Sequence, residues 1–231
     1  MKCVILQPSY IPWRGYFDQI RQADVFVFYD DVKYDKNGWR NRNRIKTKDG
    51  LQWLTIPVFN KGVEENHTPI NAIPINWSQN WHHKHWNAIR LAYSKAPYFK
   101  TYEDIFAEFF ERHDQFLSDF TIDLTITISQ LLGINTKFLC ASKLPNITGS
   151  KTERLIRILT QIGATSYLSG PSAESYLEPE RFVEAGIDLS FINYQYPPYE
   201  QLYPPYESQV SIIDLLFMEG PHALDYFIEK R

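Results

Sequence analysis

Short apolar runs alternate with helical patterns at both ends of the chain. Cys3–Leu6 is apolar and is followed by a polar loop, a short helix fits Tyr16–Gln22, and Asp24–Tyr29 has the pattern of a second buried strand. A strand, a helix and another strand in this order open a βαβ unit. Parallel strands covered on both faces are continuous apolar runs, as these two are.

The second half of the chain returns to this alternation. A helix that Thr148 or Ser150 could cap extends to about Ile162 and ends at Gly163. A helical turn fits Glu180–Glu184, and Gly220-Pro221 separates a final helix, which opens at Val210 or Ser211, from a terminal one. The predicted strands of this half are Thr136–Ala141, Tyr167–Ser169 and Ile187–Tyr194.

A different pattern fills the middle. Trp39–Lys46 alternates, Lys48-Asp49-Gly50 is a turn, and Leu51–Ile56 is a returning strand, which together predict a β-hairpin. Helical spacing follows in three segments, Trp81–Tyr93, Tyr102–Arg112 and Asp114–Leu132.

The whole pattern predicts a single α/β domain over residues 1–231. We expect a Rossmann-like open, mainly parallel sheet flanked by helices, with the β-hairpin and a helical insertion at residues 35–135.

Composition narrows the class of protein. The chain has 231 residues, a formal charge of −3 and a pI near 6.1, which do not favour a nucleic-acid partner. Cys3 and Cys140 fit no metal or redox spacing, and two cysteines suit a reducing compartment. The apolar start is too short for a signal peptide, and no run reaches the roughly 18 apolar residues of a membrane span. We therefore expect a cytoplasmic protein without membrane insertion.

The loop after the first strand is a candidate binding site, because ligands of open α/β sheets bind beyond the carboxyl ends of strands. A glycine near the helix entry would let a phosphate approach the backbone amides. The alternative is a proline-stiffened turn. The candidate residues of this loop are Gln7, Ser9, Tyr10, Arg14, Gly15 and Tyr16.

The alternating hairpin strand places Arg40, Arg42 and Arg44 on one face, about 7 Å apart. Guanidinium groups in such a row suit phosphates, carboxylates or a sugar acid. A solvated strand face is the alternative. Asn41 and Asn43 would face the opposite side.

Two further loops follow strands of the second half. Lys151 and Arg154 lie near the start of a helix, where an anion is stabilised, although a plain capped helix fits equally well. Ser169 and Gly170 end another strand. All three loops should share one edge of a parallel sheet.

Histidines gather at Trp81-His82-His83-Lys84-His85. His82 and His85 share a helix face, but no acidic or cysteine partner follows at a metal-site spacing, so no metal site is expected. A hydrogen-bonded or substrate-contacting His85 fits better. The sequence contains no Ser/His/Asp or Cys/His arrangement that indicates a nucleophile.

These segments resemble the WbqC-like family. The similarity lies in Gln7–Phe17, Asp31–Tyr34, Trp39–Lys46, Lys95–Phe99, Ser169-Gly170 and Ser211–Phe217. Lys33 stands where the family often has Gln. The resemblance implies a bacterial cytoplasmic protein, from a family often encoded with enzymes of O-antigen or other surface-polysaccharide synthesis.

The first loop is also distantly similar to that of nucleotidylyltransferases and pantothenate-synthetase-like ligases, which cradle ATP there. Those enzymes carry two histidines around the glycine, whereas this chain has Pro12 and Tyr16. Their histidine-based chemistry is therefore not carried over. Tyr16, Arg14 or the hairpin arginines would have to replace it.

The leading hypothesis is a transferase or ligase that modifies a nucleotide-activated amino sugar with an acyl or aminoacyl group. ATP or another nucleotide with Mg²⁺ is the expected cofactor, without a tightly bound metal. Asp31 or His85 would act as base, with Tyr16 as a third candidate catalytic residue. The alternative is a non-catalytic module that binds a glycan or a nucleotide sugar.

Overall fold

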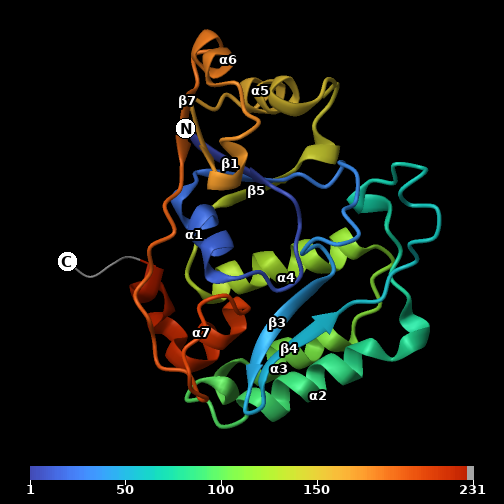
Figure 1. The fold of residues 1–231 in the computed structure, drawn as a ribbon, viewed down its shortest axis with the longest axis vertical. Helices are drawn as coiled ribbons and strands as arrows, with labels where there is room; N and C mark the ends of the chain where they lie inside the picture. Colours follow the sequence, from blue (N-terminus) through green and yellow to red (C-terminus); the bar gives the residue numbers. More distant parts are fainter. Residues whose placement is uncertain (228–231) are drawn as a thin grey trace.

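Five parallel strands form the central sheet of the computed structural model, which describes residues 1–227 (Figure 1). The strand order is β5-β2-β1-β6-β7, so the chain starts in the middle and builds one side of the sheet before the other. This topology confirms the predicted Rossmann-like sheet, and every strand pair in it is parallel. The strands are β1 (Lys2–Leu6), β2 (Val25–Phe28), β5 (Lys137–Cys140), β6 (Ser166–Ser169) and β7 (Asp188–Phe191).

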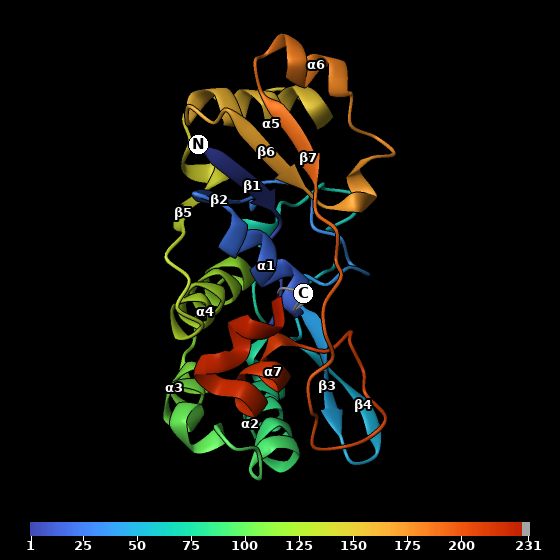
Figure 2. The same ribbon diagram turned by 90° about the vertical axis from the view of Figure 1, so that its left-hand side faces the viewer.

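Alternate residues of the central strands serve two hydrophobic cores. Val4 and Phe26 pack with Phe17 of α1 (Arg14–Gln22) and with α4 (Leu117–Leu131) on one face. Cys3 and Val27 pack with α5 (Lys151–Gln161) and α6 (Pro179–Glu184) on the other (Figure 2). The sheet is therefore covered on both faces, which explains the continuous apolar runs of β1 and β2.

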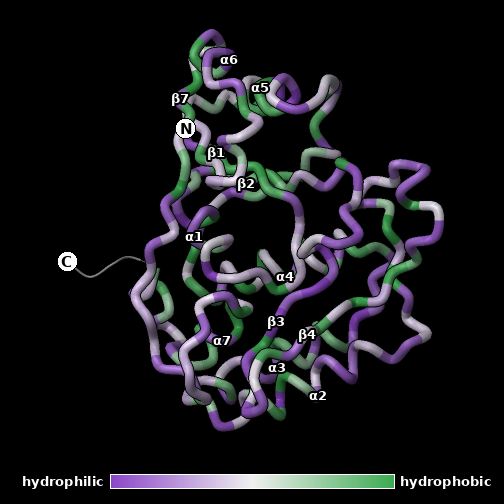
Figure 3. The backbone as a smooth tube through the Cα atoms, in the orientation of Figure 1, coloured by the Kyte–Doolittle hydropathy of each residue, from purple (hydrophilic) through white to green (hydrophobic). Residues whose placement is uncertain are grey.

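The insertion between β2 and β5 contains the hairpin and three helices. β3 (Arg42–Thr47) and β4 (Gly50–Thr55) pair antiparallel, as predicted. The purple colour of β3 in Figure 3 reflects its Arg, Asn and Lys residues. Helices α2 (Trp81–Tyr93) and α3 (Phe99–Glu111) precede α4.

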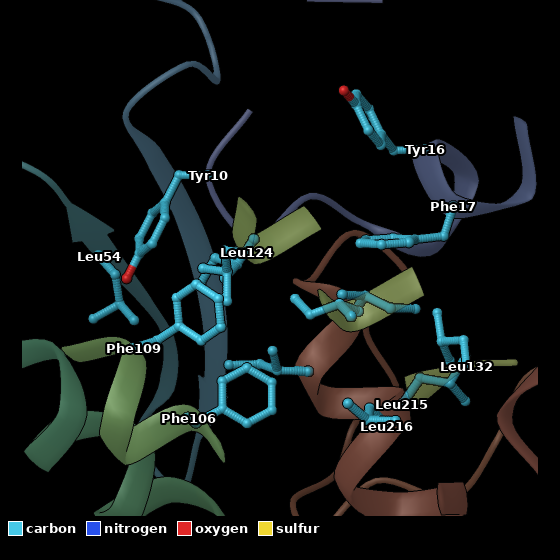
Figure 4. Packing of buried hydrophobic residues seen from close by; sticks show 14 of the residues in the cluster. Tyr10, Tyr16, Phe17, Leu54, Phe106, Phe109, Leu124, Leu132, Leu215 and Leu216 are labelled. Carbon is cyan, nitrogen blue, oxygen red and sulfur yellow. The ribbon is translucent and has the colours of Figure 1, made fainter. Parts of the chain in front are cut away.

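The sheet and the insertion share one core. Phe106 and Phe109 of α3 lie with Leu215 and Leu216 of α7 (Ile212–Glu219) and with Tyr10 in the same cluster (Figure 4). The segment after β7 thus packs against the helices of the insertion through α7. The remaining short 3-10 helices are Ile70–Ala72, Trp77–Gln79, Ala141–Lys143, Pro171–Ala173 and Gly220–Phe227.

Some boundaries differ from the sequence pattern. β7 ends at Phe191 rather than Tyr194, because the chain leaves the sheet toward the insertion. Ser150, not Thr148, is the N-cap residue of α5, and Thr148 accepts a hydrogen bond from Arg157 instead. The predicted terminal helix is a 3-10 helix as far as Phe227, and the last four residues of the predicted domain lie outside the described residues.

Candidate functional site

A cavity of about 580 Å³ opens at the carboxyl edge of the sheet. Leu6 of β1 and Tyr167 of β6 line it. These neighbouring strands are the two from which the chain winds in opposite directions, and open α/β sheets bind ligands at such a point. The cavity therefore lies where the fold itself favours a binding site.

The three strand-end loops meet at this cavity. Gln7 and Ser9 follow β1, Lys151 begins the helix after β5, and Ser172 follows β6. The structure thus brings together loops that are far apart in the sequence. The other lining residues are Ile5, Trp13, Tyr16, Gln19, Tyr29, Val32, Arg40, Leu155, Tyr176 and Tyr194.

A second cavity of about 290 Å³ adjoins the first. Both cavities have the same four residues in their walls, which are Ser9, Trp13, Tyr16 and Arg40. The rest of the smaller wall consists of Pro12, Trp39, Asn43 and Gln209. A single elongated ligand could therefore occupy both spaces.

The two cavities are cationic. Within residues 1–227, Arg40 and Lys151 are the charged residues of the two walls, which contain no Asp, Glu or His. A bound anion would therefore meet two positive groups and no like charge. This composition favours a phosphate or carboxylate ligand.

Arg40 is held at the junction of the cavities by the loop after β1. Its Nη1 donates to the carbonyls of Gln7 and Pro8 at 3.2 and 3.4 Å. Its Nε is buried and has no hydrogen-bond partner within the described residues. Desolvation lowers the pKa of Arg40, because burial disfavours the charged guanidinium. A bound anion would offset this cost.

Lys151 is exposed at the N-terminus of α5, in a left-handed backbone conformation with φ of 49°. The side chain of the N-cap residue Ser150 makes no capping hydrogen bond. The amides of the first helical turn point to the helix N-terminus, where the helix dipole also favours an anion. The ammonium group of Lys151 and the N-terminus of α5 thus both favour a bound anion.

Gln19 of α1 provides a buried polar group in the wall of the larger cavity. Its side chain is 2% exposed, and its Oε1 accepts a hydrogen bond from Tyr194 Oη at 2.9 Å. Its Nε2 has no partner among the described residues. A buried amide without a partner is costly, so a ligand acceptor at this position would gain a strong contact.

The tyrosines of the wall stay protonated. Tyr16 donates to the Gln7 carbonyl at 3.1 Å, and burial raises its pKa, only partly opposed by Arg40. Burial also raises the pKa of Tyr29 to about 12. Both groups are therefore hydrogen-bond donors rather than bases near neutral pH.

Asp31 and Arg154 pair beside the larger cavity. The Asp31 carboxylate lies 2.6 Å from Nη2 of Arg154, and the guanidinium also lies over the ring of Tyr29. Burial raises the pKa of Asp31, and Arg154 opposes that rise. The pair connects the loop after β2 to α5, and both elements contribute residues to the cavity wall.

Tyr10 and His85 contact each other in the interior. Tyr10 is fully buried, and its Oη lies 2.9 Å from Nδ1 of His85, whose side chain is 6% exposed. Desolvation lowers the pKa of His85 to about 4. His85 is thus neutral near pH 7, is packed in the insertion and lines neither cavity.

The three arginines of the hairpin segment, Arg40, Arg42 and Arg44 (the basic row), do not all reach the same place in the structure. Arg42 and Arg44 lie over the indole of Trp53, at 5.1 and 5.5 Å from its centroid. Arg44 also donates to the Gln209 carbonyl at 2.9 Å. Arg40 precedes β3 and is the member of the row that reaches the cavities. On the opposite face, Asn41 and Asn43 point inward to backbone carbonyls.

Four other candidate residues contact parts of the fold and line neither cavity; they are Arg14, Gly15, Ser169 and Gly170. Arg14 is buried and donates to the carbonyls of Pro197 and Tyr226 and to the Tyr206 hydroxyl. The indole of Trp13 occupies the space beside Gly15. Ser169 bonds the Tyr167 hydroxyl at 3.4 Å, and Gly170 is the N-cap of the short helix that carries Ser172.

Most of the residues that line the two cavities were not among the candidates that the sequence patterns selected. Gln19 looks like an ordinary helix residue, and Tyr194 and Gln209 lie in the long segment between β7 and α7. Trp39 opens the alternating segment and could have been noted as an aromatic neighbour of Arg40. The other missed residues carry no local signal, because only the packing of distant segments places them in the wall.

Membrane and metal features are absent from the described residues. No helix within residues 1–227 combines the length and apolarity needed to cross a bilayer. In the same range, His, Cys, Asp and Glu side chains form no group of three that could hold a metal ion.

Comparison with known proteins gives a family but no activity. A protein of Mycobacterium tuberculosis named as uncharacterized is 43% identical over 228 residues, which cover 97% of this chain and 96% of the relative. No solved structure matches the chain. The model of the WbqC-like protein family matches residues 7–226. The chain therefore belongs to the WbqC-like protein family.

Proposed function

We propose that this protein is a transferase or ligase that acts on a nucleotide-activated amino sugar. The transferred group is an acyl or aminoacyl group, and the pathway is bacterial surface-polysaccharide (O-antigen) synthesis, as the family resemblance implies. The observation that carries the proposal is the cavity at the β1–β6 edge, whose charged wall residues are Arg40 and Lys151. Its volume is in the range of small-molecule sites, about 300 to 1,000 Å³.

Each part of the wall has a role in this proposal. Lys151 and the first turn of α5 bind the phosphate groups, and Arg40 binds the next anionic centre along the ligand. Gln19 Nε2 donates to the ligand from the buried end of the cavity. Protonated Tyr16 turns its hydroxyl hydrogen from the Gln7 carbonyl to a developing negative charge at the junction of the two cavities.

In this proposal, catalysis depends on the orientation of the two substrates and on stabilisation of the negative charge that develops during transfer. The wall contains cations and neutral donors but no carboxylate or imidazole among the described residues. Holding donor and acceptor in contact accounts for a large share of the rate enhancement of many transferases. Asp31 remains the proposed base. Its carboxylate would reach the cavity when its ion pair with Arg154 breaks.

The same observation supports a second candidate, a non-catalytic module that binds a nucleotide sugar. Such a module needs cations and aromatic walls but no acid–base pair. Both candidates bind the same ligand, but only the transferase or ligase converts it to a product.

The test starts with thermal unfolding against nucleoside triphosphates and nucleotide sugars, with and without Mg²⁺. A ligand at a hundred times its Kd stabilises a fold by about 2.7 kcal/mol, which is readily visible. We expect stabilisation by at least one nucleotide or nucleotide sugar, and loss of the response in Lys151→Gln. Lys137→Gln, exposed at the amino end of β5, is the matched control and should behave as wild type.

No stabilisation of the wild type by any ligand of the panel would overturn the proposal. Stabilisation that survives in Lys151→Gln would place the ligand elsewhere. Product formation with the responding nucleotide sugar and an activated acyl donor then separates the transferase from the binding module.

A further inference from the structure

The smaller cavity differs in chemistry from the larger one. Arg40, at the shared wall, is its charged residue among those described, whereas the larger cavity also contains Lys151. The remaining wall of the smaller cavity consists of indoles, a phenol, side-chain amides, a hydroxyl and a proline. Phosphate binding therefore belongs to the larger cavity, and the smaller cavity suits an uncharged group.

Trp39 gives the smaller cavity an exposed aromatic surface. Its side chain is 43% exposed although it lines the cavity. The indole stacks on Trp53 with centroids 5.3 Å apart and an interplanar angle of 30°. An aromatic face next to polar groups suits a ring that has an apolar face and polar edges.

The position of Trp39 is fixed from two sides. Its carbonyl accepts a hydrogen bond from the backbone amide of Tyr10 at 3.3 Å, which attaches it to the loop after β1. The Arg44 guanidinium lies 5.7 Å from the Trp39 centroid. The surface is thus formed before a ligand arrives, which reduces the ordering cost of binding.

Hydrogen-bonding groups line the same small cavity as the Trp39 indole. Arg44 Nη2 donates to both the carbonyl and the side-chain Oε1 of Gln209, at 2.9 and 3.3 Å, and so orients the Gln209 amide. Ser9 lies in the wall that both cavities share, and its hydroxyl donates to the Gln7 carbonyl at 3.4 Å, so its oxygen can accept from a ligand. Amide and hydroxyl groups around an aromatic face are suited to the hydroxyls of a saccharide.

We infer that the smaller cavity is the saccharide subsite of the ligand. The sugar ring lies against Trp39 with its hydroxyls toward Gln209 and Ser9. The phosphate groups lie in the larger cavity, and Arg40 and Tyr16 stand at the connection between the two parts. This inference rests on the proposed function and adds the orientation of the substrate.

The orientation is tested by calorimetry on the full chain with two probes. The first is the strongest ligand among UDP-N-acetylglucosamine, GDP-mannose and dTDP-glucose, and the second is its parent nucleoside diphosphate. We expect Trp39→Ala to weaken binding of the nucleotide sugar about tenfold or more and to leave the diphosphate within about twofold of wild type. Trp39→Phe should recover most of the loss.

Two further variants complete the test. Gln209→Ala, at an exposed side chain, should weaken the nucleotide sugar selectively, by less than Trp39→Ala. Phe59→Ala removes another exposed aromatic ring, 58% exposed and outside both cavity walls, and should change neither affinity.

The outcomes separate the inference from the proposed function. Equal weakening of both probes by Trp39→Ala would place the nucleobase on Trp39 and overturn the saccharide subsite. Unchanged affinity for both probes would overturn it as well. If the wild type binds neither probe, the proposed function itself fails, and the subsite falls with it.

Discussion

The indole of Trp13 lies directly on Gly15, and a Cβ built on Gly15 would be 2.3 Å from Cζ2 of that ring. Gly15 has ordinary helical backbone geometry, so the close approach alone explains why a glycine is needed. Trp13 belongs to the wall that both cavities share. The glycine near the helix entry therefore shapes the site through the position of an aromatic ring.

Replacing Gly15 by Ala should displace the indole and disturb both cavities. We expect Gly15→Ala to weaken ligand binding about tenfold, since an aromatic wall contact contributes on the order of 1 to 2 kcal/mol. Stability should change little, because Ala favours the helix by about 1 kcal/mol and offsets part of the strain. Calorimetry measures the affinity. Near-UV circular dichroism reports the displacement of the indole and, followed during thermal unfolding, the stability.

The matched control removes the ring first. In a Trp13→Ala background nothing opposes the new methyl group, so adding Gly15→Ala should cause no further loss of affinity. A further loss as large as that seen in the wild-type background would show that Gly15 acts on the ligand directly, through its backbone.

Local patterns were sufficient for most of the fold. The buried strands β1 and β2 are continuous apolar runs because helices cover both faces of the sheet, and that alone separates them from the alternating hairpin. Boundaries failed where tertiary contacts decide them. Thr148 is an apt cap residue by type, but it bonds Arg157, and α5 starts three residues later.

The site was only partly predictable. Gln7, Ser9, Tyr16, Arg40 and Lys151 could be selected because they follow strands or carry an unexplained charge. Side chains that arrive from distant segments leave no trace in a local pattern, as the wall residues Gln19, Tyr194 and Gln209 illustrate. Whether a charged residue lines a cavity or stabilises the fold also depends on its partner, as Arg14 and Arg154 illustrate with their internal bonds.

The Asp31–Arg154 pair should connect stability to the shape of the larger cavity. Both side chains are mostly buried, at 21% and 17% exposure, so the loss of one partner leaves a poorly solvated charge or dipole. We expect Asp31→Asn and Arg154→Gln each to lower the free energy of unfolding by about 1 to 3 kcal/mol. The double variant should lose less than the sum, with a coupling of about 1 to 2 kcal/mol from urea unfolding.

A pair on the surface of the same helix provides the comparison. Arg157 and Glu153 are 2.7 Å apart, but their side chains are 49% and 40% exposed. A double-mutant cycle on this pair should give a coupling of no more than about 0.5 kcal/mol. Equal couplings for the two pairs would contradict a special role for Asp31–Arg154.

Arg40 should contribute more to anion binding than its neighbour in the basic row. Arg40→Gln removes a cation shared by both cavities, so we expect an affinity loss of about a hundredfold for any phosphate-containing ligand and a weaker salt dependence. Arg42 donates to the Asn37 carbonyl and lies over Trp53, outside both walls. Calorimetry at two salt concentrations should show Arg42→Gln within about twofold of wild type, and equal losses would contradict the assignment.

His85 should make the fold sensitive to acid. Its pKa falls from the ordinary value of 6.5 to about 4 because the ring is desolvated, although a hydrogen bond to the Thr55 backbone opposes the shift. Between these two values the unfolded chain binds the proton and the folded chain does not. Stability from this group is therefore complete above about pH 6.5 and is lost as the pH falls toward 4.

The expected loss is about 3 kcal/mol, because each tenfold change in proton affinity corresponds to about 1.4 kcal/mol. Other carboxyl groups titrate in the same range, so the measured quantity is the difference between wild type and His85→Gln in urea unfolding from pH 7 to pH 4. The variant should be less stable than wild type at pH 7 and approach it near pH 4. Leu91→Gln, on the same helix with an 81% exposed side chain, should keep the wild-type slope. A constant difference between wild type and His85→Gln across this range would show that His85 is solvated in the folded protein.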